Sequence, residues 1–366
     1  MFCVTTHHQQ AGQFSILLLR SEATHGYDDM VQAFLDVQPT TANHWRSLIL
    51  FGRNVASYKF ALARSLLEMA DRRDDFIRLD ELAAPFSRHL CEHVAASPKQ
   101  ATSPTSKFLD ACRLANAGTL PGDQLRDLTV RLGFTNVIDA FHRLGPADLP
   151  IRFFMDERAQ SRGIRITDEL RGLVQMDVTQ ELTDETEARW RLVETAWELG
   201  VSHPLIEHDA EQGSLAVRRR DRRAAVTSVR AALNGYQKGC CFYCFGKIAI
   251  VPGPTLADVD HFLPWSTRAH IGGNVDGVWN LVLSCQACNR GPAGKHDLVP
   301  ALGILHRLHT RNEFLILSHH PLRETLMMQT GLTSGGRASF LQNAWGEVAL
   351  QRGARWEPIA VAARAF

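Results

Sequence analysis

The sequence predicts a mainly helical protein with one small module that mixes helix and strand. Apolar residues recur at helical spacing through the N-terminal half, and no alternation of apolar and polar residues is long enough to demand a large sheet. Five of the eight cysteines lie between residues 240 and 288, as expected for a metal site. We therefore expect a helical domain over residues 1–205, the small module over residues 206–310 and a C-terminal helical extension over residues 311–366.

Composition gives no global attraction to nucleic acid or membrane. The 366 residues carry 40 Lys and Arg against 39 Asp and Glu, so any affinity for DNA must come from local clusters of charge. The N-terminus lacks a basic region leading into an apolar segment, and the apolar run at residues 14–19 is too short to span a bilayer. We expect a cytoplasmic protein with no membrane insertion.

Helical periodicity defines the N-terminal domain. Over residues 40–70, apolar side chains such as Trp45, Leu48 and Leu62 recur at threes, fours and sevens, which indicates one long amphipathic helix weakened at Gly52. The other segments of this domain with helical periodicity, separated by Gly, Pro and Ser breakers, are residues 79–95, 106–117, 122–132, 136–143 and 185–199. Toward the C-terminus, residues 301–312 and 338–351 show the same periodicity.

A strongly basic stretch precedes the central cysteines. Residues 217–236 combine six arginines with apolar residues at helical spacing, so we expect an amphipathic helix with one apolar face. A run of charge is usually a solvated face, but its place directly before a metal-binding motif favours contact with a phosphate backbone. The residues expected to bind nucleic acid here are Arg219, Arg222 and Arg223.

Two Cys-x-x-Cys pairs predict a structural zinc site. Cys241 and Cys244 form one pair and Cys285 and Cys288 the other, and four thiolates from two such turns can enclose a tetrahedral Zn²⁺. A thioredoxin-like redox motif explains one pair and leaves the other without a role. Cys240 can substitute in register, and the sequence leaves that alternative open. The isolated cysteines, interpreted as small buried apolar residues, are Cys3, Cys91 and Cys112.

The residues between and after the two pairs carry a second set of polar groups. Asp260 and His261 precede Pro264. Asn280 begins a short apolar stretch, and Asn289 directly follows the last cysteine. In order and spacing the segment resembles the HNH endonuclease family, whose pattern runs Cys-x-x-Cys, Asp-His before Pro, Asn before a short strand, and Cys-x-x-Cys followed by His or Asn.

The resemblance, which covers residues 237–300, implies a ββα-metal fold stapled by the zinc. It implies that His261 is the general base, a task that suits an imidazole because its pKa lies near neutrality. Asn280 would hold that imidazole through a hydrogen bond. Asp260 and Asn289 would give oxygen ligands to a catalytic Mg²⁺ or Mn²⁺. The expected short strands are residues 248–251, 256–261 and 281–284.

One part departs from the family's pattern. Members commonly carry a Lys about three residues beyond the last His or Asn, whereas residues 290–294 intervene here before Lys295. We expect Arg290 and Lys295 to contact phosphates. His296 is a further candidate for a metal ligand or phosphate contact, although a lone His near a loop is more often neither.

These observations lead to the hypothesis of a metal-dependent DNA endonuclease. Nucleases of this build resemble components of bacterial anti-phage defence systems, the Zorya type II nuclease among them, which implies DNA as a partner and protein partners from a multi-gene system. A zinc ribbon that only binds DNA is the main alternative, and it leaves Asp260, His261 and the two asparagines unexplained. A metal-stabilised scaffold for protein partners ranks below both because it predicts no nuclease residues.

Overall fold

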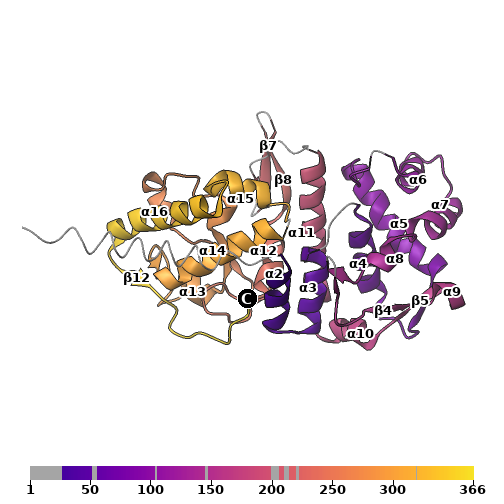
Figure 1. The fold of residues 1–366 in the computed structure, drawn as a ribbon, viewed down its shortest axis with the longest axis horizontal. Helices are drawn as coiled ribbons and strands as arrows, with labels where there is room; N and C mark the ends of the chain where they lie inside the picture. Colours follow the sequence, from indigo (N-terminus) through magenta and orange to yellow (C-terminus); the bar gives the residue numbers. More distant parts are fainter. Residues whose placement is uncertain are drawn as a thin grey trace, which may run out of the picture. The chain divides into compact units, whose positions relative to one another are not determined.

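The computed structural model describes residues 27–51, 56–103, 105–144, 147–198, 206–209, 214–219, 222–318 and 320–366 (Figure 1). They are mainly helical with small sheets, which confirms the predicted fold class at that level. Contacts divide the chain into unit 1, Met1–Val37 with His203–Phe366, and unit 2, Gln38–Ser202. In the part of the chain so described, no helix is both long and apolar enough to cross a membrane.

Unit 2 is built on helices. They are α3 (Thr41–Phe51), α4 (Tyr58–Met69), α5 (Leu79–Ala96), α6 (Lys107–Asn116), α7 (Gly122–Leu128), a π-helical turn at Thr129–Gly133, α8 (Val137–Ala140), α9 (Arg158–Ser161), α10 (Asp168–Gln175) and α11 (Thr179–Glu198). Helix α4 packs against α5 and α11, and the rings of Phe60 and Trp190 stack with centroids 5.9 Å apart. Burial of these apolar faces stabilises the unit.

Unit 2 also contains strands, which the prediction of a helical domain over residues 1–205 did not include. Strands β1 (Phe76–Arg78), β5 (Gly163–Ile166) and β4 (Phe154–Asp156) form an antiparallel sheet in that order. A shorter pair joins β2 (Arg143–Leu144) to β3 (Ala147–Asp148). Strands of two to four residues are too short for alternation to be recognised in the sequence.

The single helix expected over residues 40–70 is two helices in the structure. Helix α3 ends at Phe51 and α4 begins at Tyr58, after the buried Ser57. The backbone N–H of Ser57 donates to the Gln100 carbonyl (3.0 Å), and its hydroxyl donates to the Gln100 side chain (2.6 Å). These hydrogen bonds to a residue far away in sequence interrupt the helix, although the apolar periodicity predicts that it continues. Gly52 lies outside the described residues.

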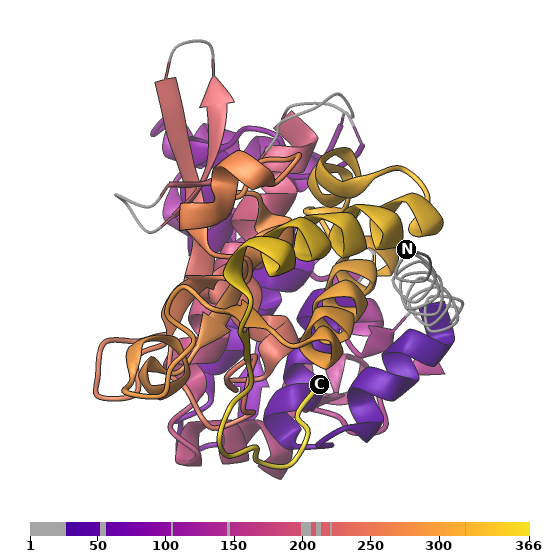
Figure 2. The ribbon, with the colours of Figure 1, turned by 90° about the vertical axis from the view of Figure 1, so that its left-hand side faces the viewer.

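Unit 1 contains the remaining elements (Figures 1 and 2). Its helices are α2 (Tyr27–Asp36), α12 (Val229–Gln237), η3 (Trp265–His270), η4 (Val278–Asn280), α13 (Gln286–Arg290), α14 (Leu302–Leu317), α15 (Arg323–Thr330) and α16 (Ser334–Arg352). Its strands are β6 (Ile206–Asp209), β7 (Ser214–Arg219), β8 (Arg222–Ser228), β9 (Asp258–His261), β10 (Leu281–Ser284), β11 (Val299–Pro300) and β12 (Arg355–Trp356). Helix α16 lies across α14 and also packs on η3.

The basic stretch at residues 217–236 is only partly helical, which corrects the prediction of one helix. Strands β7 and β8 pair antiparallel, with Arg219 opposite Arg222 and Arg218 opposite Arg223, and the helix starts only at Val229. The apolar residues here fit one face of a helix and also fit a strand. Pairing of β7 with β6, another segment of the chain, favours the strand. Local spacing therefore could not separate the two structures.

Two residues at the end of α12 fix the chain before the cysteines. Lys238 takes a left-handed conformation (φ 55°), and its ammonium donates to the carbonyls of Phe34 (2.6 Å) and Val37 (2.5 Å). The Gln237 amide donates to the Leu283 carbonyl (2.8 Å) and accepts from the Leu283 N–H (2.9 Å). Helix α12 is thereby joined both to α2 and to β10.

Candidate metal centre and hairpin site

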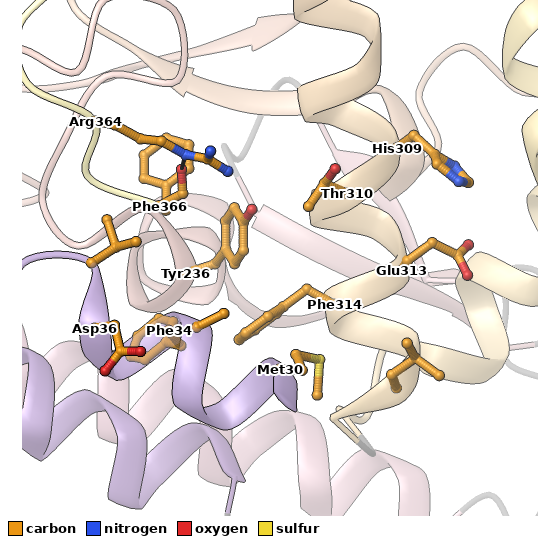
Figure 3. A pocket seen from close by; sticks show the side chains of 13 residues that line it. Met30, Phe34, Asp36, Tyr236, His309, Thr310, Glu313, Phe314, Arg364 and Phe366 are labelled. Carbon is orange, nitrogen blue, oxygen red and sulfur yellow. Dashed lines mark hydrogen bonds between the residues drawn. The ribbon is translucent and has the colours of Figure 1, made fainter. Parts of the chain in front are cut away.

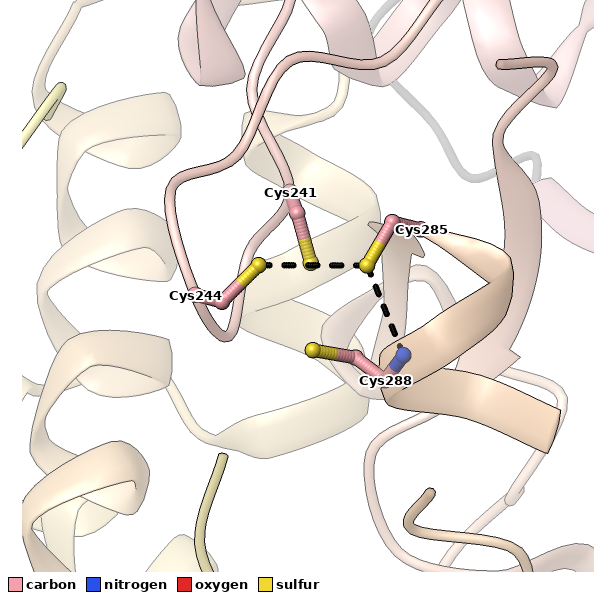
Figure 4. Close-up of side chains that lie close together, drawn as sticks. All are labelled: Cys241, Cys244, Cys285 and Cys288. Carbon is pink, nitrogen blue, oxygen red and sulfur yellow. Dashed lines mark hydrogen bonds between the residues drawn. The ribbon is translucent and has the colours of Figure 1, made fainter. Parts of the chain in front are cut away.

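Four cysteines from two turns converge in unit 1 (Figure 4). The Sγ atoms of Cys241, Cys244, Cys285 and Cys288 all lie within 4.8 Å of one another, and those of Cys244 and Cys285 are 3.8 Å apart. A tetrahedron of thiolates around zinc, with bonds of about 2.3 Å, has edges of about 3.8 Å. The four side chains therefore fit a tetrahedral ion such as Zn²⁺.

Hydrogen bonds within the group favour the thiolate form at two of the four cysteines and raise the pKa of the other two, Cys241 and Cys288. Hydrogen bonding from the Cys241 thiol lowers the pKa of Cys244 and lowers that of Cys285 to about 6. Backbone N–H groups of Gly246 and Cys288 also donate to Cys244 and Cys285, each at 3.4 Å. Thiolate is the form that binds metal.

Cys240 does not belong to this group, which settles the alternative that the sequence left open. It is buried and its thiol donates to the Lys238 carbonyl (3.6 Å). Arg307 of α14 also holds the turn between Cys241 and Cys244, because its guanidinium donates to the carbonyls of Phe242 and Tyr243 (2.5 and 2.7 Å). The metal turn is thus fixed by contacts outside the cysteines.

Strands β9 and β10 form the hairpin predicted beside the cysteines. They pair antiparallel, with His261 opposite Leu281 and Asp260 opposite Val282, and α13 packs on β9. Residues 281–284 form the predicted strand, whereas residues 248–251 make only one isolated bridge, between Ala249 and Leu256. The hairpin and the short helix after it bring the candidate site residues into one region of unit 1.

His261, at the end of β9, is paired with an aspartate that the sequence did not single out. Its Nε2 lies 2.9 Å from Oδ1 of Asp276, and its side chain is 19% exposed. Because a carboxylate only accepts hydrogen bonds, Nε2 carries the proton in this contact. In the neutral imidazole this leaves the basic lone pair on Nδ1.

Asn280 does not hold the imidazole, contrary to the prediction. Its fully buried amide accepts from the Leu263 N–H (2.8 Å) and donates to the carbonyls of Leu263 and Val275 (both 3.0 Å). These backbone groups saturate the amide, so Asn280 instead ties together the two ends of the loop that brings Asp276 to His261. The residue is a structural anchor of the site.

Asp260 lies inside the hairpin region. Its carboxylate accepts from the Tyr243 hydroxyl (2.6 Å) and lies 3.3 Å from the ammonium of Lys295. Burial raises the pKa of Asp260, and the charge of Lys295 opposes that effect. The carboxylate is thus already neutralised by protein groups, which the sequence did not indicate.

Lys295 is not placed for the phosphate contact that we predicted. Its side chain is 1% exposed, and besides Asp260 its ammonium contacts the carbonyls of His261 (3.0 Å) and His296 (3.2 Å). Burial of an ammonium requires such compensation, which the neighbouring carboxylate supplies. His296 is exposed and its Nε2 contacts the Gly291 carbonyl (2.8 Å).

Asn289 contacts Asp258, whereas Asp260 is the carboxylate with which it was predicted to share a cation. Its amide donates to Oδ2 of Asp258 (3.1 Å), and Arg290 donates to the same oxygen (2.9 Å). Asp258 and Asp260 lie two residues apart on β9 and so share one face of the strand. The Arg290 side chain remains 62% exposed. Nothing is described for the side chains of Arg219, Arg222 and Arg223.

Sequence reasoning therefore missed three functional candidates. Asp258 carried a usable signal, since it precedes Asp260 at the spacing of a strand face. Tyr243 lies inside the first cysteine pair, but nothing in that motif indicates a bond to Asp260. Asp276 carried no signal, because its contact with His261 depends on how the intervening loop folds.

Unit 1 also contains a cavity of about 430 Å³, between α2, α12, α14 and the last residues of the chain (Figure 3). Aromatic side chains such as Phe34, Tyr236 and Phe314 line it. Burial raises the pKa of Tyr236 to about 12, so its hydroxyl is neutral at pH 7. None of the predicted site residues lines this cavity.

Comparison with known proteins assigns no family: no family model matches the chain, and neither does any curated protein or solved structure. Any function proposed for the site must therefore be argued from the residues that form it.

Proposed function

We propose that the protein is a metal-dependent endonuclease of the HNH type that hydrolyses phosphodiester bonds in DNA. The observation that carries the proposal is the pairing of His261 with Asp276 at the end of a hairpin fixed by the four cysteines. An imidazole oriented by a carboxylate can act as a general base, and oxygen donors for a hard cation lie on the same strand and on α13.

The roles follow from the contacts. Asp276 accepts from Nε2 of His261, holds the ring and stabilises the imidazolium that forms. The imidazole of His261 then takes the proton of the attacking water. Asn280 keeps both residues in place by fixing the ends of the loop between them.

Three side chains offer oxygen donors to a divalent cation. Asp258 and Asn289 are partly accessible, and Asp260 is buried between Tyr243 and Lys295. Carboxylate and amide oxygens are the donor types that Mg²⁺ and Mn²⁺ prefer. When bound, a divalent cation would supply charge neutralisation at the scissile phosphate. Asp260 would have to exchange its contact with Lys295 to become a ligand.

Phosphate contacts are proposed for Arg290 and for three arginines of the basic stretch. Arg290, at the end of α13, lies directly beside Asp258 and Asn289. Arg219, Arg222 and Arg223 belong to the β7–β8 hairpin that precedes the first cysteine pair, and the register brings their backbones together at one end. Positive charge concentrated in this way attracts the phosphate backbone without regard to base sequence.

A zinc-stabilised protein that only binds DNA is the second candidate. It is favoured by one observation, the ion pair of Asp260 with Lys295 and its hydrogen bond from Tyr243, because a carboxylate so paired is a weaker ligand for a second cation. In this alternative the His261 and Asp276 pair is a structural contact.

Incubation of the purified protein with supercoiled plasmid and Mg²⁺ or Mn²⁺ tests the proposal. We expect open-circle or linear product, its loss on chelation of the added cation, and its loss in His261→Ala with DNA affinity retained, because a base acts in the transition state. His306→Ala, a histidine change on α14, is the control and should cleave like wild type. DNA binding without cleavage under either cation would select the second candidate.

A further inference from the structure

An exposed tryptophan lies close to the proposed site. Trp265 begins η3 four residues after His261, and 48% of its surface is exposed although the three residues before it are buried. Among the large apolar side chains that are exposed in the described residues, it is the one aromatic. An exposed indole beside a site offers a flat apolar surface on which a planar ligand group can stack.

A guanidinium covers the indole. The Arg268 Cζ lies 3.6 Å from the centre of the Trp265 ring, which is the distance of a stacked cation–π pair. An indole has two faces, and the exposure of Trp265 leaves surface for a second planar group. Arg268 itself is exposed, so its charge also reaches solvent beside the ring.

The turn that carries Trp265 is fixed. Thr267 is buried and donates from both its N–H (2.9 Å) and its hydroxyl (2.5 Å) to the Pro264 carbonyl. Helix α16 packs on η3. A pre-ordered aromatic side chain loses little conformational entropy when a ligand stacks on it.

The turn is also tied to the residues around His261. Arg352 donates to the Ser266 hydroxyl (2.5 Å) and lies 3.8 Å from the Asp297 carboxylate. Asp297 follows Lys295 by two residues, and the Lys295 ammonium donates to the His261 carbonyl (3.0 Å). Trp265 and Arg268 therefore lie within the loop that joins His261 to Asp276 and bring exposed positive charge to it.

We propose that Trp265, Arg268 and Arg352, here called the Trp265 platform, bind single-stranded nucleic acid by stacking an unpaired base on the indole. This inference rests on the proposed nuclease function and names its substrate class: DNA with unpaired nucleotides next to the scissile phosphate. Bases in an intact duplex are stacked on one another and offer no free face to a side chain. Aromatic rings interleaved with positive charge are how proteins bind single strands without sequence preference.

The test measures binding, not cleavage. In the His261→Ala background without added divalent cation, fluorescence anisotropy compares a labelled single strand with the duplex of the same sequence. We expect the parent to prefer the single strand, Trp265→Ala to lose about five- to a hundredfold of that affinity, and Trp265→Phe to retain most of it. Duplex affinity should change less than twofold.

A matched control and a salt titration complete the experiment. Leu114→Ala removes another exposed apolar side chain, from unit 2, and should leave both affinities unchanged. Arg268→Ala should reduce the slope of log affinity against log salt, whereas Trp265→Ala should not, because stacking releases no counterion. Circular dichroism and thermal unfolding confirm that each variant is folded.

The outcomes separate the two proposals. Unchanged single-strand affinity in Trp265→Ala, or an equal loss for strand and duplex, would overturn the platform. If Trp265→Ala loses single-strand affinity but the wild-type protein cleaves no DNA, the platform stands and the nuclease assignment fails. If duplex and single strand are cleaved at equal rates and Trp265→Ala affects both equally, the nuclease proposal is supported and the Trp265 platform is contradicted.

Discussion

His261 acquires its proposed function from its partner and not from its sequence neighbours alone. The imidazole ends a strand, and the carboxylate that orients it lies in a loop whose two ends are joined by Asn280. Each contact makes the next one possible, since the buried amide fixes the loop, the loop brings Asp276 near, and Asp276 sets the tautomer. If His261 is the general base, as we propose, Asp276 is a second residue of the site whose role mutation can test.

Replacing Asp276 tests that arrangement. Asp276→Asn keeps the size of the side chain but removes the charge that stabilises the imidazolium, so we expect kcat on plasmid DNA to fall roughly tenfold to a hundredfold with KM nearly unchanged. Steady-state nicking assays measure both constants. Asp123→Asn, an exposed change on α7, is the control. Full activity of Asp276→Asn would show that the contact is structural.

At this scale the sequence identified residue types better than it identified their partners. The motif picked out His261 and the four cysteines, because spacing within a short segment determines which side chains can meet. Lys295 was expected on the surface, yet it lies buried on Asp260. That contact spans 35 positions and depends on tertiary packing, which periodicity and motif spacing do not report.

At the scale of elements, most long helices were predictable, whereas the only short strands predicted were those implied by the family resemblance, such as residues 281–284. Helices α5 and α16 follow the expected segments because their apolar periodicity extends over several turns. The β7–β8 hairpin was assigned to a helix because its pairing partners, not its local pattern, decide its structure. The strands of the β1–β5–β4 sheet were missed for the same reason.

A histidine between two of these short elements predicts acid sensitivity. His142 follows α8, and its Nε2 accepts from the Phe153 N–H (3.0 Å), which requires the neutral ring. Burial lowers its pKa to about 4. The unfolded chain therefore binds the proton first, and stability present above pH 6.5 is lost as the pH falls toward 4, by about 2–3 kcal/mol.

Denaturant unfolding at several pH values measures this loss, followed by the fluorescence of Trp45, whose ring lies 4.9 Å from Phe153. His142→Gln keeps an acceptor but does not titrate, so it should flatten the profile between pH 6.5 and 4. His89 also has a pKa of about 4 and should leave a residual slope. Two glutamates raise the pKa of His93, so its contribution changes only above pH 6.5. An identical profile in His142→Gln would contradict the prediction.

At the scale of the whole molecule, the chain is divided differently from the expected domains. The first 37 residues belong to unit 1 with the C-terminal part, and unit 2 lies between them in sequence. The contact that joins α2 to α12, from Lys238 to the Phe34 and Val37 carbonyls, links positions about 200 residues apart. No local pattern reports such a contact, so the sequence alone could not place α2.

The same division predicts a selective effect of metal removal. The four-cysteine group lies in unit 1, so a strong zinc chelator should raise hydrogen exchange in β9, β10 and α13 and leave α4, α5 and α11 of unit 2 protected. Structural zinc contributes roughly 10 kcal/mol or more in small sites, enough to decide whether the hairpin is ordered. Exchange measured by mass spectrometry resolves these segments.

Cysteine variants provide the matched pair for that experiment. We expect one zinc per chain in wild type, loss of that zinc with exposure of the hairpin in Cys285→Ser, and retention of it in Cys240→Ser, whose buried thiol lies outside the group. Metal analysis of the purified proteins measures the stoichiometry. Zinc retained in Cys285→Ser, or lost in Cys240→Ser, would show that the ligand set is assigned wrongly.

The Gln237 side chain has a consequence for self-association. A strand at the margin of a sheet presents unpaired N–H and C=O groups that can recruit the strand of another molecule. Strand β10 pairs with β9 on one side, and on the other the Gln237 amide takes both backbone groups of Leu283, with Phe242 N–H adding a second bond to the same carbonyl. The Gln237 side chain thus takes the place of a neighbouring strand at this position. We expect it to prevent a strand of another molecule from pairing with β10 there.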